Sequence, residues 1–158
     1  MVMSAIDLKN PKKTATILED PKINVKIKLS ALWVTLMFFY LYNDVFTLFQ
    51  PGIIEEIVAG EVGGFRITQV FLLGAAILMA IPIFMVFLSL TLKAKANRWT
   101  NIILGIFHAV VLLTTLLVPG ALWVYYALYM IVEAVLIALI VWHAWKWPTQ
   151  EDHTLRGI

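Results

Sequence analysis

Four long apolar segments constrain the fold of this 158-residue chain more than any other feature. A helix rises 1.5 Å per residue, so about twenty apolar residues cross the roughly 30 Å hydrocarbon core of a bilayer. Each of the four segments is about that long. They cover residues 27–49, 67–92, 100–118 and 121–147. The pattern predicts an all-α fold, a four-helix transmembrane bundle.

The composition agrees with a membrane protein. Hydrophobic residues make up 61% of the chain and charged residues 14%, whereas soluble domains are about half apolar and a quarter charged. The chain has no cysteine, which excludes disulfide bonds and thiolate chemistry. The formal net charge of +2 is too small to indicate a nucleic-acid partner.

The cations are distributed unevenly, and their distribution predicts an orientation. With four spans, the N-terminal arm, the loop between the second and third spans and the C-terminal tail share one side. Those regions and the span ends that adjoin them hold eleven of the twelve lysines and arginines; only Arg66 lies on the other side, near Glu55, Glu56 and Glu61. Because cytoplasmic loops are enriched in cations, we expect both termini in the cytoplasm and the chain in the cytoplasmic (inner) membrane.

These boundaries divide the chain into three parts. Residues 1–26 are expected to form a basic cytoplasmic arm, residues 27–147 the transmembrane domain, and residues 148–158 a cytoplasmic tail. The arm lacks the apolar h-region of a cleaved signal peptide, so the first span should be an uncleaved anchor. Residues 53–67 favour a short surface helix followed by glycine-rich turns, and Pro82 should kink the second helix.

Three ionisable side chains fall within spans, namely those of Asp44, His108 and Glu133. A charge at the bilayer centre costs at least about 2.5–3.5 kcal/mol on insertion scales, so such side chains usually face the bundle interior. At 1.5 Å per residue, Glu133 lies about 18 Å from the non-cytoplasmic end of the fourth span. His108 lies about 15 Å from the non-cytoplasmic end of the third span. The two side chains can therefore lie at one level.

Polar residues continue along three of the spans. Tyr126 and Tyr129 share a helical face with Glu133 through i, i+3, i+7 spacing. If the polar lines of the three spans converge, they form a cavity with Glu133 and His108 at its floor. The expected lining residues are Tyr126, Tyr129, Tyr40, Asn43, Asp44 and Asn101.

Two interpretations of Glu133 stay open. In the first, hydrogen bonds to His108, Asn101 or a tyrosine fix the helix register, although such bonds average well under 2 kcal/mol in membranes. In the second, the cavity binds or passes a small ligand, or moves a proton between Glu133 and His108.

Other functions compete with ligand or proton handling. The chain could be a non-catalytic accessory or scaffold subunit of a larger membrane complex, or an intramembrane isomerase or hydrolase of a lipid-like substrate. No span carries two metal ligands at i, i+3 or i, i+4 spacing, so neither a metal site nor a cofactor is expected. Because one four-helix chain is small for a channel, a homodimer or a partner membrane protein is expected in the bilayer.

The segments YLYNDVF (residues 40–46) and FQPG (residues 49–52) carry a family resemblance. Together with the four-span layout, they make the chain similar to an uncharacterised family of small prokaryotic four-helix integral membrane proteins. The resemblance covers Lys22 to about Trp147. It implies the same number of spans and no assigned activity.

Overall fold

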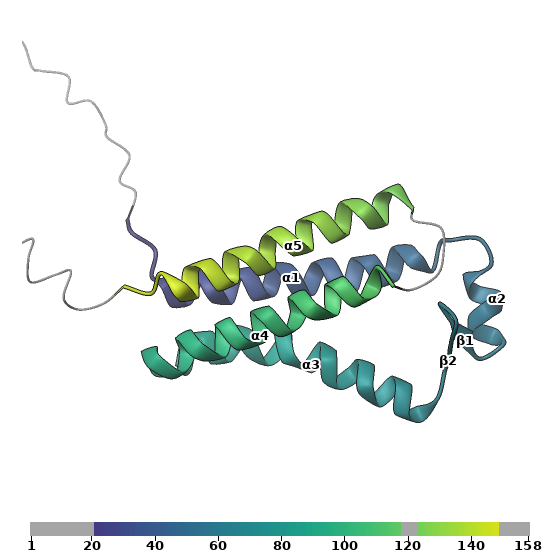
Figure 1. Ribbon diagram of the computed structural model, residues 1–158, viewed down its shortest axis with the longest axis horizontal. Coiled ribbons are helices and arrows are strands. Elements are labelled where there is room, and N and C mark those ends of the chain that lie inside the picture. The colour runs from purple at the N-terminus through teal and green to yellow at the C-terminus, as the bar shows by residue number, and fades with distance from the viewer. Residues whose placement is uncertain (1–20, 118–122, 149–158) are drawn as a thin grey trace, which may run out of the picture.

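A bundle of four long helices forms the body of the protein (Figure 1). The computed structural model describes residues 21–117 and 123–148. The long helices are α1 (Val25–Thr47), α3 (Gln69–Thr91), α4 (Ala94–Thr115) and α5 (Val124–Trp145). Among the described residues, these four helices are long and apolar enough to cross a membrane. The predicted all-α, four-helix fold is confirmed, and the helices support a multi-pass membrane protein.

Helix α4 begins six residues earlier than the start at residue 100 that hydropathy predicts. Only Leu92 and Lys93 lie between the last residue of α3 and the first residue of α4, so the connection between the two helices is two residues long. Lys95 and Arg98 therefore belong to the first turns of α4 rather than to a loop. Hydropathy finds the start of an apolar run, whereas alanine, lysine and arginine are good helix formers in any environment.

The helices pack unequally. Helix α1 packs against α3 and α5, α4 packs mainly against α5, and α3 and α4 contact each other over a short length. Figure 1 shows α3 diverging from α4 toward its N-terminus, where Val70, Leu73 and Ile77 are more than half exposed. Pro82 lies within α3 and has no N–H to bond the carbonyl of Leu78.

A short helix and a hairpin connect α1 to α3. As expected, a short helix follows α1; it is α2 (Ile53–Val58). Strand β1 (Glu61–Val62) then pairs antiparallel with β2 (Phe65–Arg66). Gly63 and Gly64 form the turn with positive φ angles, which glycine adopts without strain. Two-residue strands are too short for an alternating pattern, so the sequence does not predict this hairpin.

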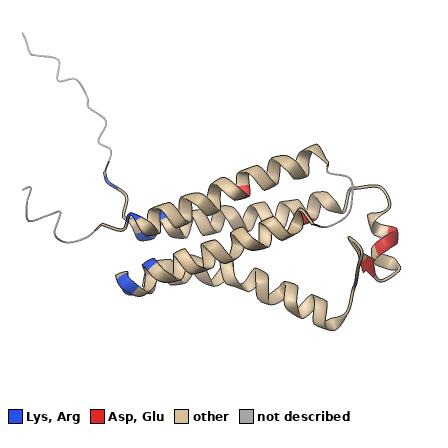
Figure 2. Ribbon diagram, viewed as in Figure 1, with Lys and Arg blue, Asp and Glu red and all other residues tan. Residues whose placement is uncertain are grey.

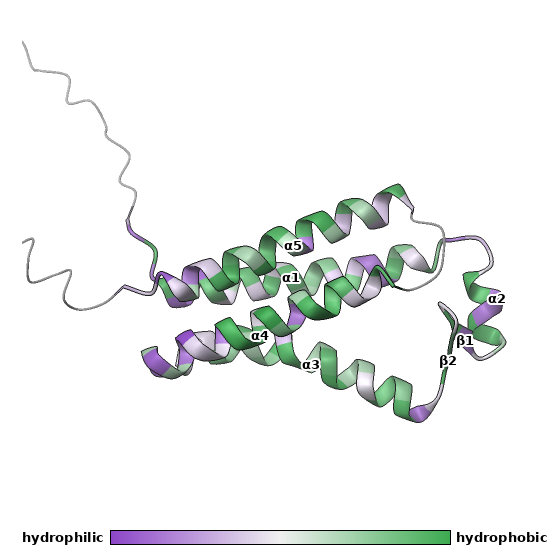
Figure 3. Cartoon of the chain, viewed as in Figure 1, coloured by the Kyte–Doolittle hydropathy of each residue, from purple (hydrophilic) through white to green (hydrophobic). Residues whose placement is uncertain are grey.

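Charged residues separate to the two ends of the bundle (Figure 2). One end, here named the acidic end, carries Glu55, Glu56, Glu61 and Arg66. The other end, here named the basic end, carries Lys22, Lys26, Lys28, Lys93, Lys95, Arg98 and Lys146. Between the two ends, the helices are mostly apolar (Figure 3). This is the charge distribution of a bundle that crosses a bilayer.

Gly105 allows α4 to approach α5 closely. A Cβ atom added to Gly105 would lie 2.7 Å from Cγ2 of Val141, well inside the roughly 3.5–4.0 Å at which carbon atoms pack. The small residue expected at a membrane helix interface is therefore required here by a specific neighbour.

Substitution of Gly105 by alanine should destabilise the protein by about 1–3 kcal/mol, because the added methyl group overlaps Val141. Gly74→Ala is the matched control, since nothing lies within 4 Å of a Cβ added to that helical glycine. The control should be neutral or slightly stabilising. Thermal unfolding in detergent micelles measures both effects, and Val141→Ala should partly rescue Gly105→Ala. Equal melting temperatures for the two glycine variants would contradict the close contact.

Candidate functional site

The four long helices enclose a pocket of about 170 Å³ in the half of the bundle toward the acidic end. An engineered cavity of roughly 150 Å³ binds benzene, so this pocket can hold a small molecule or a few waters. Its polar lining residues are Tyr40, Asn43, Asp44, His108, Thr115, Tyr126 and Glu133. Its apolar lining residues are Leu78, Met79, Val111 and Leu112.

His108 is held in the pocket wall by aromatic neighbours. Its ring stacks on that of Tyr40 with centroids 5.7 Å apart, and its Nδ1 is 3.1 Å from the Tyr40 hydroxyl. The edge of Trp33 contacts the same imidazole. His108 is only 1% exposed, and its Nε2 has no hydrogen-bond partner among the described residues. His108 therefore keeps one buried ring nitrogen unpaired within the described residues, on a side chain that lines the pocket.

Glu133 lines the same pocket from α5 and is 4% exposed. No described residue donates a hydrogen bond to its Oε1. The register interpretation expects a hydrogen bond from Glu133 to His108, Asn101 or a tyrosine, and this oxygen forms none of them with the described residues. A buried carboxyl group without a partner is costly in an apolar environment.

Asp44 places a second carboxyl group at the pocket. It lies one turn from the end of α1 and is exposed. The carbonyl oxygen of the Asn43 side chain is buried without a partner, and no lysine or arginine lines the pocket among the described residues. The described lining therefore holds two carboxyl groups with no lysine or arginine to balance them. Within the described ranges, no three His, Asp or Glu side chains gather closely enough to hold a metal ion.

The structure brings together most of the predicted lining residues, but it places Tyr129 elsewhere. Tyr129 contacts the rings of Phe39, Phe46 and Tyr125. Tyr126 and Glu133 are seven residues apart and nearly eclipsed along the helix, whereas Tyr129 is rotated from their common direction. Because of that rotation, the Tyr129 ring packs in an aromatic cluster with residues of α1.

Asn101 also lies outside the pocket, in a buried polar network nearer the basic end. Its Oδ1 accepts from Trp33 Nε1 at 2.7 Å, and its Nδ2 donates to Asn97 Oδ1 at 2.7 Å. Asn97 in turn donates to the carbonyl of Ser89 at 2.6 Å. The i, i+7 spacing puts Asn101 on the face of His108, but about 10 Å away along the helix. The network thus connects α1, α3 and α4 instead of lining the pocket.

Some lining residues are not among those expected from the sequence. Thr115 continues the i, i+7 polar line of Asn101 and His108, and the structure places it at the pocket with His108. Leu78 and Met79 on α3 are apolar and give no polar signal. The only hint in the sequence is Pro82, which leaves the Leu78 carbonyl without its helical donor.

Asn101→Ala should lower the free energy of unfolding by about 1–3 kcal/mol, because it leaves buried groups of Trp33 and Asn97 unpaired. Glu133→Gln should change stability little, since the carboxyl oxygen Oε1 has no partner to lose. Thr91→Val serves as a control, because the Thr91 hydroxyl bonds only the Phe87 carbonyl of its own helix. Unfolding by sodium dodecyl sulfate measures all three. A larger loss for Glu133→Gln than for Asn101→Ala would contradict these assignments.

Comparison with known proteins agrees with the resemblance seen in the sequence. No curated protein and no solved structure matches this chain. A family model does match residues 17–154, which include all four long helices and every residue of the pocket. The family carries no assigned activity, as the sequence resemblance implies. The chain belongs to the family described as a family of unknown function (DUF6326).

Proposed function

We propose that this membrane protein binds a small ligand in its polar pocket or passes a proton through it, with Glu133 and His108 as the ionisable pair. The observation that carries the proposal is the buried Oε1 of Glu133, a pocket-lining residue, to which no described residue donates a hydrogen bond. An unsatisfied polar group of this kind costs about 1–3 kcal/mol. An intramembrane ionisable residue that no partner explains is best interpreted as functional.

The lining favours an occupant that is cationic or donates hydrogen bonds. Glu133, Asp44 and Asn43 supply acceptor oxygens. Since no described cation lines the pocket, a negatively charged ligand would meet uncompensated repulsion. Protons carried by water and small protonated amines fit both the volume and the charge of the pocket.

Access is proposed from the acidic end. Asp44 is exposed and lies near the end of α1, whereas Glu133 and His108 are almost completely buried. An entering ion would therefore meet Asp44 before Glu133. By the positive-inside rule, the basic end faces the cytoplasm, both termini lie inside and the protein resides in the cytoplasmic membrane. The pocket would then open toward the outer side.

A second candidate is an accessory subunit or a homodimer. The exposed half of α3 supports it, because Val70, Leu73 and Ile77 are more than half exposed near the acidic end. Partner helices in membranes often cover such faces through close packing. Purification with a stoichiometric partner protein, or a doubled mass in mild detergent, would favour this candidate.

The test uses the full chain reconstituted in vesicles that contain the pH-sensitive dye pyranine. A proton gradient is imposed while valinomycin and potassium clamp the membrane potential. Wild-type vesicles should acidify faster than empty ones, and added methylammonium should slow this flux. Glu133→Gln should reduce the flux by about tenfold or more, as expected for loss of a proton-transferring group. Glu61→Gln, at the acidic end outside the pocket, should leave the flux unchanged.

A second readout covers ligand binding without transport. Methylammonium should raise the melting temperature of the wild-type protein, because a ligand that binds only the folded state stabilises it. Glu133→Gln should abolish this shift, while Glu61→Gln keeps it. If the Glu133 variant equals wild type in both flux and methylammonium-dependent melting between pH 5 and pH 8, the proposed function is wrong.

A further inference from the structure

An apolar groove of about 510 Å³ runs along the surface between α4 and α5. Three alanines, Ala109, Ala134 and Ala138, line it together with branched and aromatic side chains. The groove extends from the middle of the two helices to Trp142 and Trp145, which lie close to the basic end. Neither Glu133 nor His108 lines the groove, so it is distinct from the polar pocket.

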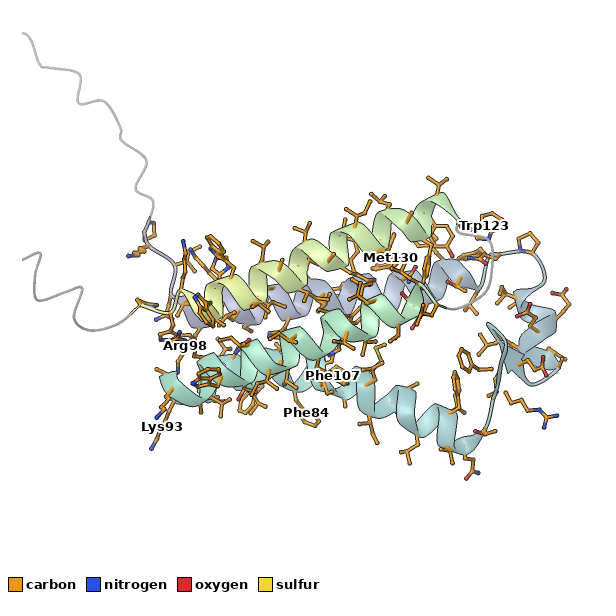
Figure 4. The ribbon with its side chains drawn as sticks, viewed as in Figure 1. Phe84, Lys93, Arg98, Phe107, Trp123 and Met130 are labelled. Carbon is orange, nitrogen blue, oxygen red and sulfur yellow. The ribbon has the colours of Figure 1, made fainter. Side chains whose placement is uncertain are left out.

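Cations stand beside both tryptophans at this end of the groove. The guanidinium carbon of Arg98 is 5.8 Å from the ring centroid of Trp145, and Nζ of Lys146 is 3.9 Å from that of Trp142. The Nε of Arg98 is buried and has no hydrogen-bond partner within residues 21–117 and 123–148. Figure 4 shows Arg98 near the start of α4. In the described part of the chain, no aspartate or glutamate lies at the basic end.

We infer that the groove is a binding site for an anionic phospholipid, with one acyl chain between α4 and α5 and the phosphate group beside Arg98 and Lys146. Guanidinium groups bind phosphate oxygens through several hydrogen bonds. Basic pockets beside apolar helix surfaces are a known mode of anionic lipid recognition. A neighbouring pocket on Trp142, lined also by Lys22, Lys28 and Lys146, adds positive charge around the same headgroup.

The shape and charge of the groove favour a lipid over a protein helix. The groove is apolar along the helices and cationic at one end only, which is the distribution of a single acyl chain and its phosphate. The two tryptophans lie where interfacial aromatic residues usually mark the headgroup level. An apolar second helix, about 10 Å in diameter, would present no anionic group to the cations at one end of the groove.

The test is native mass spectrometry of the full-length protein from micelles that contain equal amounts of phosphatidylglycerol and phosphatidylcholine with identical acyl chains. Wild-type protein should retain one phosphatidylglycerol, with a preference of about tenfold or more over phosphatidylcholine. Each cation near a membrane surface contributes roughly 1 kcal/mol, or about fivefold in affinity, toward anionic lipid. The double variant Arg98→Gln, Lys146→Gln should therefore lose most of the preference.

The matched charge control is Lys93→Gln with Lys95→Gln. It removes the same charge from the same end, and Figure 4 shows Lys93 directed away from the bundle. In this control, the logarithm of the preference for phosphatidylglycerol over phosphatidylcholine should remain at least half of the wild-type value. Equal retention of the two lipids by wild-type protein, or an equal loss in both double variants, would overturn the inference.

A second set of variants tests the acyl-chain part of the groove. Ala138→Phe should fill the groove and reduce retention of both lipids, whereas Ala76→Phe on the exposed face of α3 should not. If Ala138→Phe does not fold, Ala134→Leu replaces it. Unchanged lipid retention in the folded groove variant would overturn the inference, as would a lipid-free dimer that dissociates when the groove is filled.

Discussion

Polar groups inside an apolar helix bundle depend on protein partners, because lipid offers them none. In the half of the bundle near the basic end, Asn101 satisfies this requirement through bonds to Trp33 and Asn97. In the other half, Glu133 and His108 keep unpartnered buried atoms around a pocket. The same constraint is therefore met by a hydrogen-bonded network in one half, whereas in the other half Glu133 and His108 keep buried polar atoms that no described residue pairs.

The packing of helix α3 also differs between the same two halves of the bundle. Toward the basic end it is tied to α1, since Ser30 donates to the Val86 carbonyl at 2.8 Å and Lys26 Nζ to the Leu92 carbonyl at 2.7 Å. Beyond Pro82, toward the acidic end, most of its residues are exposed. Segments with few buried contacts have the lowest local stability. We therefore expect the pocket wall that Leu78 and Met79 supply to move more readily than the other three walls.

The sequence predicts the helices and the burial of Glu133 and His108 because both depend on strong, repeating signals. Apolar length defines a span, and a rare ionisable residue within it must face the interior. The position of Asn101 could not be derived in the same way. A shared helical face does not reveal which level of the bundle a residue meets, and that level depends on the neighbours Trp33 and Ser89. The early start of α4 was missed because Lys95 and Arg98 are polar.

The spacing between α4 and α5 links the two proposed sites. Glu133 and Ala134 are consecutive on α5, yet the first lines the polar pocket and the second lines the apolar groove. Leu112 of α4 lines both. Gly105 fixes how near the two helices lie through its contact with Val141. Because close-packed interfaces shift as units rather than deform continuously, an acyl chain that changes this spacing would also change the distance between His108 and Glu133.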